Sequence, residues 1–270
     1  MPAATDDPIT GRVALVTGAS SGIGAASAVA LAATGARVGI CARRADRLQE
    51  VVDRCQEHAV DVAMFTVDLA DLDRLPDFAR QVEAGLGAVD VLVNNVGVPK
   101  RRRMQDITPS EIDDVMRINF MSPVVLTTEL LPGMLDRGWG RIVNVSSMGT
   151  RSAAVRVGAY AASKAALEAW TEGLMLDLLG TGVMAQLLVP GTTKTEFALP
   201  RGTDDEPFPP DSNALEPEVV ADALVALLRS TDFEGFASDD HAALSAQKRS
   251  DPNAFLAMVR DVLGPSTTDK

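Results

Sequence analysis

One tyrosine, one lysine and one serine have the types and the spacing for proton transfer. Tyr160 and Lys164 are four residues apart, so on a helix they project from the same face. A phenol with a pKa of about 10 is a poor base at neutral pH, and a nearby ammonium group favours the phenolate. Ser147 precedes Tyr160 by thirteen residues and follows an apolar run. A lone Y-x-x-x-K is more often a surface pair, so its meaning depends on the neighbouring motifs.

A glycine-rich turn lies near the start of the chain, between an apolar run and an alanine-rich segment. It reads Thr17-Gly18-Ala19-Ser20-Ser21-Gly22-Ile23-Gly24. Glycines allow close approach to a pyrophosphate, and the helix that follows offers free N–H groups and the positive end of its dipole. The G-x-x-x-G-x-G spacing is wider than the common fingerprint, and no Lys-Ser/Thr follows as in a P-loop. The turn predicts a dinucleotide site rather than a mere bend, and Tyr, Lys and Ser beside a dinucleotide indicate hydride transfer.

Two arginines indicate which dinucleotide is bound. Arg43 and Arg44 follow the second apolar run, where an NAD site places an acidic residue for the ribose 2′-OH, and Ala42 stands there instead. A guanidinium fork suits a 2′-phosphate, so the sequence favours NADP(H) over NAD(H). The alternative is that both arginines simply begin a solvated helix.

These residues need a scaffold, and the alternation of apolar runs with helix-length segments predicts one. The predicted strands are residues 13–16, 37–41, 62–67, 89–93, 141–145 and 184–189. The predicted helices are residues 22–34, 45–58, 72–85, 108–135, 160–179 and 217–229. The runs lack period-two alternation, as strands buried on both faces do. We expect an α/β fold with a doubly wound parallel sheet of about seven strands, covered by helices on both faces in three α/β/α layers.

Two stretches break this alternation. Residues 196–213 hold four prolines and several acidic residues and are predicted to form a long substrate loop. Beyond Arg229 the pattern fades, and we expect a last strand at 234–238 and a terminal helix at 253–263. No low-complexity linker divides the chain. We therefore expect a single domain, residues 1–270, with an atypical C-terminal extension over residues 232–270.

Composition excludes several function classes. The 270 residues carry a net charge of −12, which disfavours binding to nucleic acid or anionic membranes. Two cysteines and two histidines far apart in the sequence argue against a disulfide scaffold and against a metal site. No segment approaches the roughly 18 uninterrupted apolar residues of a membrane span, and the N-terminus lacks the regions of a signal peptide. We expect a soluble cytoplasmic protein with no metal, no nucleic-acid partner and no membrane partner.

The order of these motifs resembles that of the classical short-chain dehydrogenases/reductases. Beyond the glycine-rich turn, the matches are Asp68-Leu69, Asn94-Asn95-Val96-Gly97, Asn119, Ser147, Tyr160-Ala161-Ala162-Ser163-Lys164 and Pro190-Gly191-Thr192-Thr193-Lys194-Thr195. They cover roughly residues 10–230. The resemblance implies a Rossmann-like fold and an NADP(H)-dependent oxidoreductase that interconverts a small-molecule carbonyl and a secondary alcohol. It also implies a homodimer or a homotetramer.

The resemblance implies a role for each matched residue. Tyr160 would be the general acid/base, Ser147 would orient the substrate oxygen, and Lys164 would bind the nicotinamide ribose and lower the pKa of Tyr160. Asn119 would hold a water that links Lys164 to solvent. Ser146 competes with Ser147, but the thirteen-residue spacing to the tyrosine favours Ser147. Together with the two arginines, the expected cofactor-binding residues are Gly18, Ser20, Ser21, Gly22, Ile23, Gly24, Arg43, Arg44, Asp68, Leu69, Asn95, Gly97, Tyr160, Lys164, Pro190, Gly191, Thr193 and Thr195.

The chain also departs from the family. Val96 replaces the alanine of Asn-Asn-Ala-Gly, Thr193 stands where an aliphatic residue is common, and the tail lacks the glycine-rich ending of many members. In many relatives that ending helps to build a tetramer, so dimer and tetramer both remain open.

Some residues and functions keep two interpretations. The basic run at residues 100–103 is interpreted as a solvated loop, the alternative being attraction of an anionic substrate or a cofactor phosphate. Arg151 and Arg156 either pair with a substrate carboxylate or lie at the surface. A non-catalytic NADP(H)-binding sensor or scaffold and an NAD-preferring dehydrogenase remain alternatives, because a fold alone does not decide function. The complete set of Asn119, Ser147, Tyr160 and Lys164 argues against the sensor.

Overall fold

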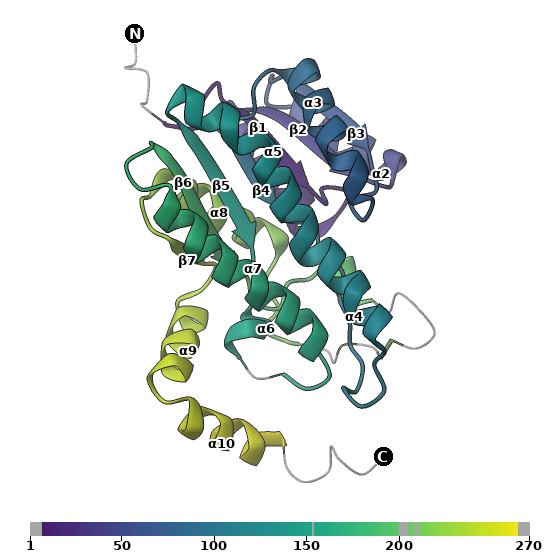
Figure 1. Ribbon diagram of the computed structural model, residues 1–270, viewed down its shortest axis with the longest axis vertical. Helices are drawn as coiled ribbons and strands as arrows, with labels where there is room; N and C mark the ends of the chain where they lie inside the picture. Colours follow the sequence, from purple (N-terminus) through teal and green to yellow (C-terminus); the bar gives the residue numbers. More distant parts are fainter. Residues whose placement is uncertain (1–6, 153, 200–204, 207, 209–210, 264–270) are drawn as a thin grey trace.

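A seven-stranded parallel sheet forms the centre of the molecule (Figure 1). The computed structural model describes residues 7–152, 154–199, 205–206, 208 and 211–263. The strand order is β3-β2-β1-β4-β5-β6-β7, so the chain reverses its winding between β1 and β4. The strands are β1 (Val13–Thr17), β2 (Arg37–Ala42), β3 (Val62–Thr66), β4 (Val91–Asn94), β5 (Gly140–Val145), β6 (Val183–Val189) and β7 (Glu234–Phe236). The six strands predicted from the apolar runs and the seventh predicted at 234–238 are all confirmed.

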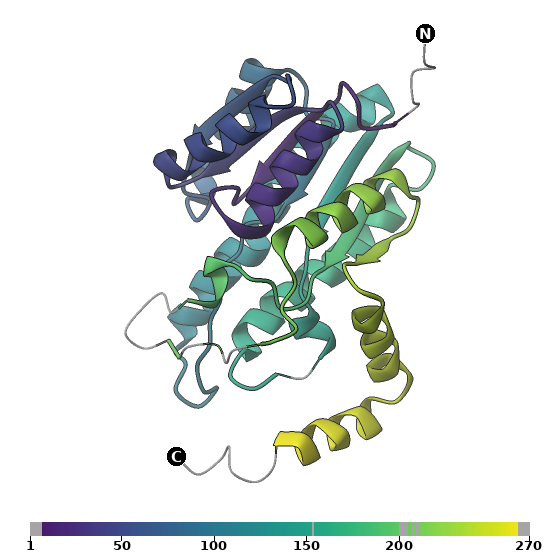
Figure 2. The ribbon, with the colours of Figure 1, turned by 180° about the vertical axis from the view of Figure 1, so that it is seen from behind.

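Helices cover both faces of this sheet, in the three layers that the sequence predicts. They are α1 (Gly22–Ala33), α2 (Ala45–Gln56), α3 (Leu75–Leu86), α4 (Pro109–Met116), α5 (Ser122–Arg137), α6 (Met148–Arg151), α7 (Gly158–Asp177), α8 (Pro217–Arg229), α9 (Asp239–Ser250) and α10 (Pro252–Leu263). Figure 1 looks onto the face with α3, α5 and α7, and Figure 2 looks onto the face with α1 and α8.

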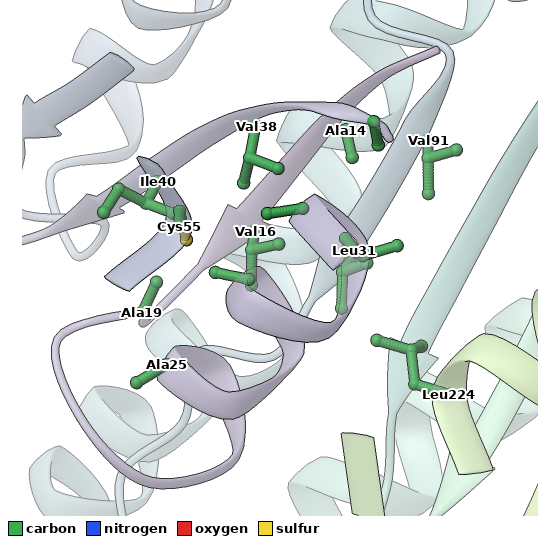
Figure 3. Close-up of a cluster of buried hydrophobic side chains, with 14 of the residues drawn as sticks. Ala14, Val16, Ala19, Ala25, Leu31, Val38, Ile40, Cys55, Val91 and Leu224 are labelled. Atoms are coloured by element: carbon green, nitrogen blue, oxygen red, sulfur yellow. The ribbon is translucent and has the colours of Figure 1, made fainter. Parts of the chain in front are cut away.

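A core of aliphatic side chains holds α1 against the sheet (Figure 3). Val16 and Val38 point from β1 and β2 toward Leu31 of α1, and all three are fully buried. Leu224 of α8 belongs to the same cluster. Burying a side chain of this kind contributes about 1.5–3 kcal/mol. This packing fixes the N-terminus of α1 at the carboxyl end of β1, where ligands bind in open α/β sheets.

The predicted helix at 108–135 contains a π-helical turn, Arg117–Met121, between α4 and α5. Among the described residues, one helical run, Pro109–Arg137, is long and apolar enough to cross a membrane by length and composition. Its α5 part buries Leu126 and Leu130 in the core cluster with α3 and the sheet. The run is therefore explained as a helix of the sheet-covering layer.

The C-terminal extension contains a helix that the sequence analysis missed. The expected terminal helix is α10, but α9 precedes it and packs against α6. Start and stop signals for α9 are present in the sequence: the Ser238 hydroxyl accepts a hydrogen bond from the Asp240 N–H, and Lys248 and Arg249 lie in the last turn. Both helices extend away from the sheet (Figures 1 and 2). This position makes the tail a neighbour of the loops that follow β5 and β6.

Candidate active site

The glycine-rich turn between β1 and α1 is packed so closely that its glycine positions have no room for a Cβ. Gly18 has a φ of +66°, and a Cβ added there would lie 2.9 Å from the Val96 Cα. A Cβ on Gly24 would lie 2.5 Å from the Asn95 Nδ2 atom, which donates to the Thr17 carbonyl at 2.9 Å. Ser21 precedes α1 without a side-chain cap, and the first turn of α1 has no acidic residue. The N–H groups at this helix end are thus available to an anion, which fits a dinucleotide pyrophosphate.

One cavity of about 1370 Å³ runs along the carboxyl ends of the strands. Its volume exceeds the roughly 300–1,000 Å³ of a typical small-molecule pocket. Every expected cofactor-binding residue lines it: Gly18, Ser20, Ser21, Gly22, Ile23, Gly24, Arg43, Arg44, Asp68, Leu69, Asn95, Gly97, Tyr160, Lys164, Pro190, Gly191, Thr193 and Thr195. Ser147 lines it as well. The cavity therefore brings together residues from β1 to the segment after β6.

Tyr160 is buried on α7 at this cavity, and its phenol shares a hydrogen bond with Ser147. Burial raises the pKa of Tyr160 to about 12, and the hydrogen bond from Ser147 opposes that rise. The expectation of a lowered pKa is wrong for this arrangement. The reason is that removing the charged phenolate from water outweighs the other influences on it.

Lys164 lies one helical turn beyond Tyr160 and is also buried. Its ammonium donates to the Val145 carbonyl at 2.9 Å. Burial lowers the pKa of Lys164 to about 8, while the negative charge of Glu168 raises it. A Cβ added to Gly97 would lie 3.4 Å from the Lys164 Nζ atom, so glycine keeps space open beside the ammonium.

Asn119 sits in the π-helical turn, buried behind the cavity rather than in its lining. Its Nδ2 atom donates to the Val98 carbonyl at 3.1 Å and to Ser163 Oγ at 3.0 Å. Its Oδ1 atom accepts from the Val98 N–H at 2.8 Å. Both amide hydrogens are therefore used, and only the second lone pair of Oδ1 remains for the predicted water.

The two adjacent serines after β5 have different partners. Ser147 Oγ accepts from the Gly149 N–H at 3.0 Å and shares a hydrogen bond with the Tyr160 phenol. Ser146 is only 2% exposed, although it too lines the cavity, and its hydroxyl donates to the Glu168 carboxylate. The geometry therefore favours Ser147 over Ser146 as the partner of the tyrosine.

The two arginines of the expected 2′-phosphate site differ in their contacts. Arg44 donates to Glu196 Oε2 at 2.8 Å and to Ser20 Oγ and Ser21 Oγ at 3.1 Å each. Arg43 is exposed and lines the cavity. The backbone of Arg44 forms the N-cap of α2, as the alternative interpretation of a helix start expects. Its side chain, however, is held by hydrogen bonds rather than free in solvent.

The basic run at residues 100–103 is not a solvated loop. Lys100 pairs with Asp205 at 2.9 Å and with Glu111 at 2.8 Å, and its side chain is only 15% exposed. Arg101 pairs with Glu206 at 3.3 Å, and Arg156 pairs with the same carboxylate. These cations hold the described acidic part of the predicted substrate loop. The loop predicted over residues 196–213 also includes residues 200–204, 207 and 209–210, which lie outside the described residues.

Residues beyond the tyrosine form an apolar wall that the sequence motifs do not mark. Phe197 lies with its ring centroid 5.5 Å from that of Tyr160. The other apolar members of this wall are Met148, Val155, Val157, Leu199 and Phe208. Met148 begins the four-residue helix α6 and the others lie in irregular segments, so no periodicity signals which side chains face a cavity. Only the position of these segments after β5 and β6 could have indicated them.

Comparisons with known proteins agree with this geometry. The family model for short chain dehydrogenases matches residues 12–206. An uncharacterized oxidoreductase of Mycobacterium bovis is 32% identical over 98% of this chain and 74% of its own length. A fatty acyl-CoA reductase of Acinetobacter baylyi is 34% identical over 80% of this chain and 72% of its own length. A short chain dehydrogenase of Pseudocercospora fijiensis is 37% identical over 71% of this chain, and the match spans only 63% of that relative.

Solved structures show the same likeness over nearly the whole chain. The crystal structure of a short-chain dehydrogenase from Streptomyces avermitilis has a TM-score of 0.79 and 29% identity, covering 96% of this chain and 98% of that one. A metagenomic short-chain oxidoreductase, solved in complex with NADP, has a TM-score of 0.70 and 30% identity, covering 83% of this chain and 96% of that one. With the family model matching more than half of the sequence, this chain belongs to the short-chain dehydrogenase/reductase family.

Proposed function

We propose that this oxidoreductase interconverts a carbonyl and a secondary alcohol by NADP(H)-dependent hydride transfer, with Tyr160 as the general acid/base. The observation that supports this most strongly is that Ser147, Tyr160 and Lys164 line the same cavity as every expected cofactor-binding residue. A sensor that only binds NADP(H) has no need of a buried phenol hydrogen-bonded to a serine.

The residues present fit the cofactor along the length of the cavity. The N–H groups at the start of α1 would hold the pyrophosphate, and Arg43 and Arg44 would hold the 2′-phosphate. Asp68 and Leu69 would border the adenine, and Lys164 would bind the nicotinamide ribose. The bound nicotinamide supplies the hydride acceptor or donor.

The chain itself handles the proton. At neutral pH a phenol with a raised pKa carries its proton, so Tyr160 Oη is ready to protonate a carbonyl oxygen as that oxygen becomes an alkoxide. The Ser147 hydroxyl orients the same oxygen. In the reverse direction Tyr160 must first lose its proton, and the Lys164 ammonium one turn away favours that loss.

A preference for NADP(H) is supported by charge. Two guanidiniums lie at the end of β2, Ala42 stands where an NAD site has a carboxylate, and a related solved structure is a complex with NADP. NAD-preferring members remain the alternative, and paired affinities for NADPH and NADH distinguish the two.

The substrate side of the cavity supports an apolar carbonyl compound. Phe197 lies next to Tyr160, and Met148, Val155, Val157 and Leu199 continue the wall. Apolar walls contribute binding by removing apolar surface from water, and they offer sugar hydroxyls no partners. The similarity to a fatty acyl-CoA reductase agrees with an apolar substrate.

The test is turnover by the purified protein with NADPH and a series of alkyl and aryl ketones and aldehydes. We expect Tyr160→Phe to lose at least about 10²-fold in kcat while still binding NADPH. Turnover that survives this change would refute the mechanism, and NADPH binding without turnover on any carbonyl would favour the sensor. The homo-oligomer and the cytoplasmic location stay predictions, the first checked by light scattering.

A further inference from the structure

A buried carboxylate that the proposed chemistry does not use lies one helical turn beyond Lys164. Glu168 is only 9% exposed. A charged group in such a place is costly unless it is paired and hydrogen-bonded, so its partners are informative.

Among the described residues, the hydrogen-bond and ion-pair partners of Glu168 lie on the short segment that carries Ser147. Its Oε1 atom accepts from the Ser146 hydroxyl and lies 2.7 Å from Thr150 Oγ1, and its Oε2 atom lies 3.1 Å from Arg151 Nη2. Ser147 is thus held from both sides, by the residue before it and by the helical turn after it. Because Glu168 and Tyr160 share α7, these bonds tie Ser147 to the tyrosine whose phenol it contacts.

The charges continue outward from Glu168 to the tail. Arg151 also pairs with Glu234 of β7 at 2.6 Å, and Glu234 in turn pairs with Arg249 of α9 at 3.3 Å. A hydrogen bond also joins α9 directly to α6, since Lys248 Nζ donates to the Thr150 carbonyl at 2.9 Å. In Figure 1, α9 follows β7 on the side of α6, and α6 and α9 are in contact.

The tail also contacts the turn that follows β6. The His241 ring of α9 packs directly on Gly191, leaving no space for a Cβ there. The neighbouring Pro190 carbonyl accepts from the Met148 N–H at 2.8 Å, which joins this turn to the start of α6. One helix of the tail therefore contacts both segments that border the proposed reaction centre.

We propose that Glu168 is a positioning residue for the reaction, and that it holds Ser147 against Tyr160 through a chain of ion pairs that ends in α9. This inference rests on the proposed function, because it assigns Glu168 a part in the same proton transfer. Positioning of this kind has large effects on rate, since a displacement of about 1 Å can cost roughly 10²-fold.

Glu168 has a second influence, through its charge. Its carboxylate raises the pKa of Lys164 and so opposes the lowering caused by burial. The charged groups around Glu168 are Lys164 on its own helix, Arg151 on α6 and, beyond Arg151, Glu234 on β7 with Lys248 and Arg249 on α9. Removing the charge at position 168 will lower the pKa of Lys164 further and move proton loss from that ammonium to lower pH.

The experiment compares Glu168→Gln with Glu172→Gln, the same change one turn along α7 at an exposed position. With NADPH and an accepted carbonyl compound, we expect Glu168→Gln to lower kcat about tenfold. The Kd for NADPH should stay within about twofold, and the alkaline limb of the kcat profile should move to lower pH. Glu172→Gln should behave as wild type in all three measurements.

A second variant acts from the outer end of the chain, in case Glu168→Gln folds poorly. Glu234→Gln leaves α7 untouched, and Gln247→Ala on the exposed side of α9 is its control. We expect Glu234→Gln to lower kcat with little change in KM. In the double variant Glu168→Gln/Glu234→Gln, the fold-loss in kcat should be smaller than the product of the two single fold-losses. Wild-type kcat and pH profile in both Glu168→Gln and Glu234→Gln would overturn the proposal. Absence of turnover in the wild type would refute the proposed function instead.

Discussion

The guanidinium of Arg44 lies 2.8 Å from the carboxylate of Glu196, although 152 residues separate the two in the chain. The same guanidinium donates to Ser20 and Ser21 in the glycine-rich turn. The hydrogen bond from Arg44 lowers the pKa of Glu196, so this carboxylate is charged at neutral pH. A 2′-phosphate at this end of the cavity would have to share Arg44 with Glu196.

Neutralising Glu196 should therefore strengthen NADPH binding, whereas removing Arg44 should weaken it. We expect Glu196→Gln to tighten NADPH several-fold and Arg44→Ala to weaken it about tenfold, since each charge-assisted hydrogen bond contributes roughly 1.5–3 kcal/mol. The affinity for NADH should change little in either variant. Fluorescence titration with both cofactors measures this, and Arg54→Ala, at an exposed arginine farther along α2, is the control. An unchanged NADPH-to-NADH ratio in Arg44→Ala would contradict the phosphate-binding role.

The raised pKa of Tyr160 predicts that the two reaction directions respond differently to pH. With a pKa of about 12 the phenol is protonated throughout the range from pH 6 to 8, so carbonyl reduction should be nearly independent of pH there. Alcohol oxidation needs the phenolate, whose fraction rises tenfold for each pH unit below the pKa. Initial rates of both directions, measured between pH 6 and 8, test this. Equal pH dependence in the two directions would exclude Tyr160 as the group that exchanges the proton.

The fold and the gathering of the expected cofactor-binding residues around one cavity could be predicted because their signals are local. Strands such as β1 and β2 are short runs of apolar residues, and parallel strands place their carboxyl ends at one edge of the sheet. The residues that follow each strand therefore lie together at that edge of the sheet. The glycine-rich turn after β1 and the Pro190-Gly191 turn after β6 are the clearest cases, and both line the cavity.

What could not be predicted depends on contacts between distant segments. Lys100 is paired with Asp205, and neither residue carries a signal of the other. The direction of the pKa shift at Tyr160 depends on how completely α7 is covered, which no spacing reports. Helix α9 was missed because its sequence is polar, and it is held by ion pairs such as that between Arg249 and Glu234.

Phe197 should determine which carbonyl compounds are accepted. Its ring is tilted against that of Tyr160 with centroids 5.5 Å apart, so in the proposed reaction it would border a group attached to the reacting carbon. Phe197→Ala removes that wall, and we expect KM for an aryl or long-chain alkyl ketone to rise about tenfold or more. A small hydroxylated ketone should be affected less than twofold, and Phe197→Leu should restore most of the loss. Val262→Ala, at an exposed position on α10, is the control. A loss of equal size on both kinds of substrate would indicate damage to the tyrosine rather than a specificity role.

Lys164 should make stability depend on pH in a recognisable way. Its pKa is about 8 in the folded protein and 10.5 when unperturbed, so between these values the unfolded chain binds more protons. The free energy of unfolding contributed by this group therefore rises with pH across that window, by about 1.4 kcal/mol per pH unit.

Buried Cys41 and Cys55 act in the opposite direction above pH 9.0, because burial raises the pKa of the first to about 12 and of the second to about 11. The contribution of Lys164 is isolated by subtracting Lys164→Met, which keeps both thiols and removes the ammonium. Urea unfolding at several pH values between 7 and 10 should give a wild-type-minus-variant difference that increases with pH. A flat difference would mean that the ammonium of Lys164 stays charged in the folded protein, and that the carbonyl of Val145 and the carboxylate of Glu168 fully compensate its burial.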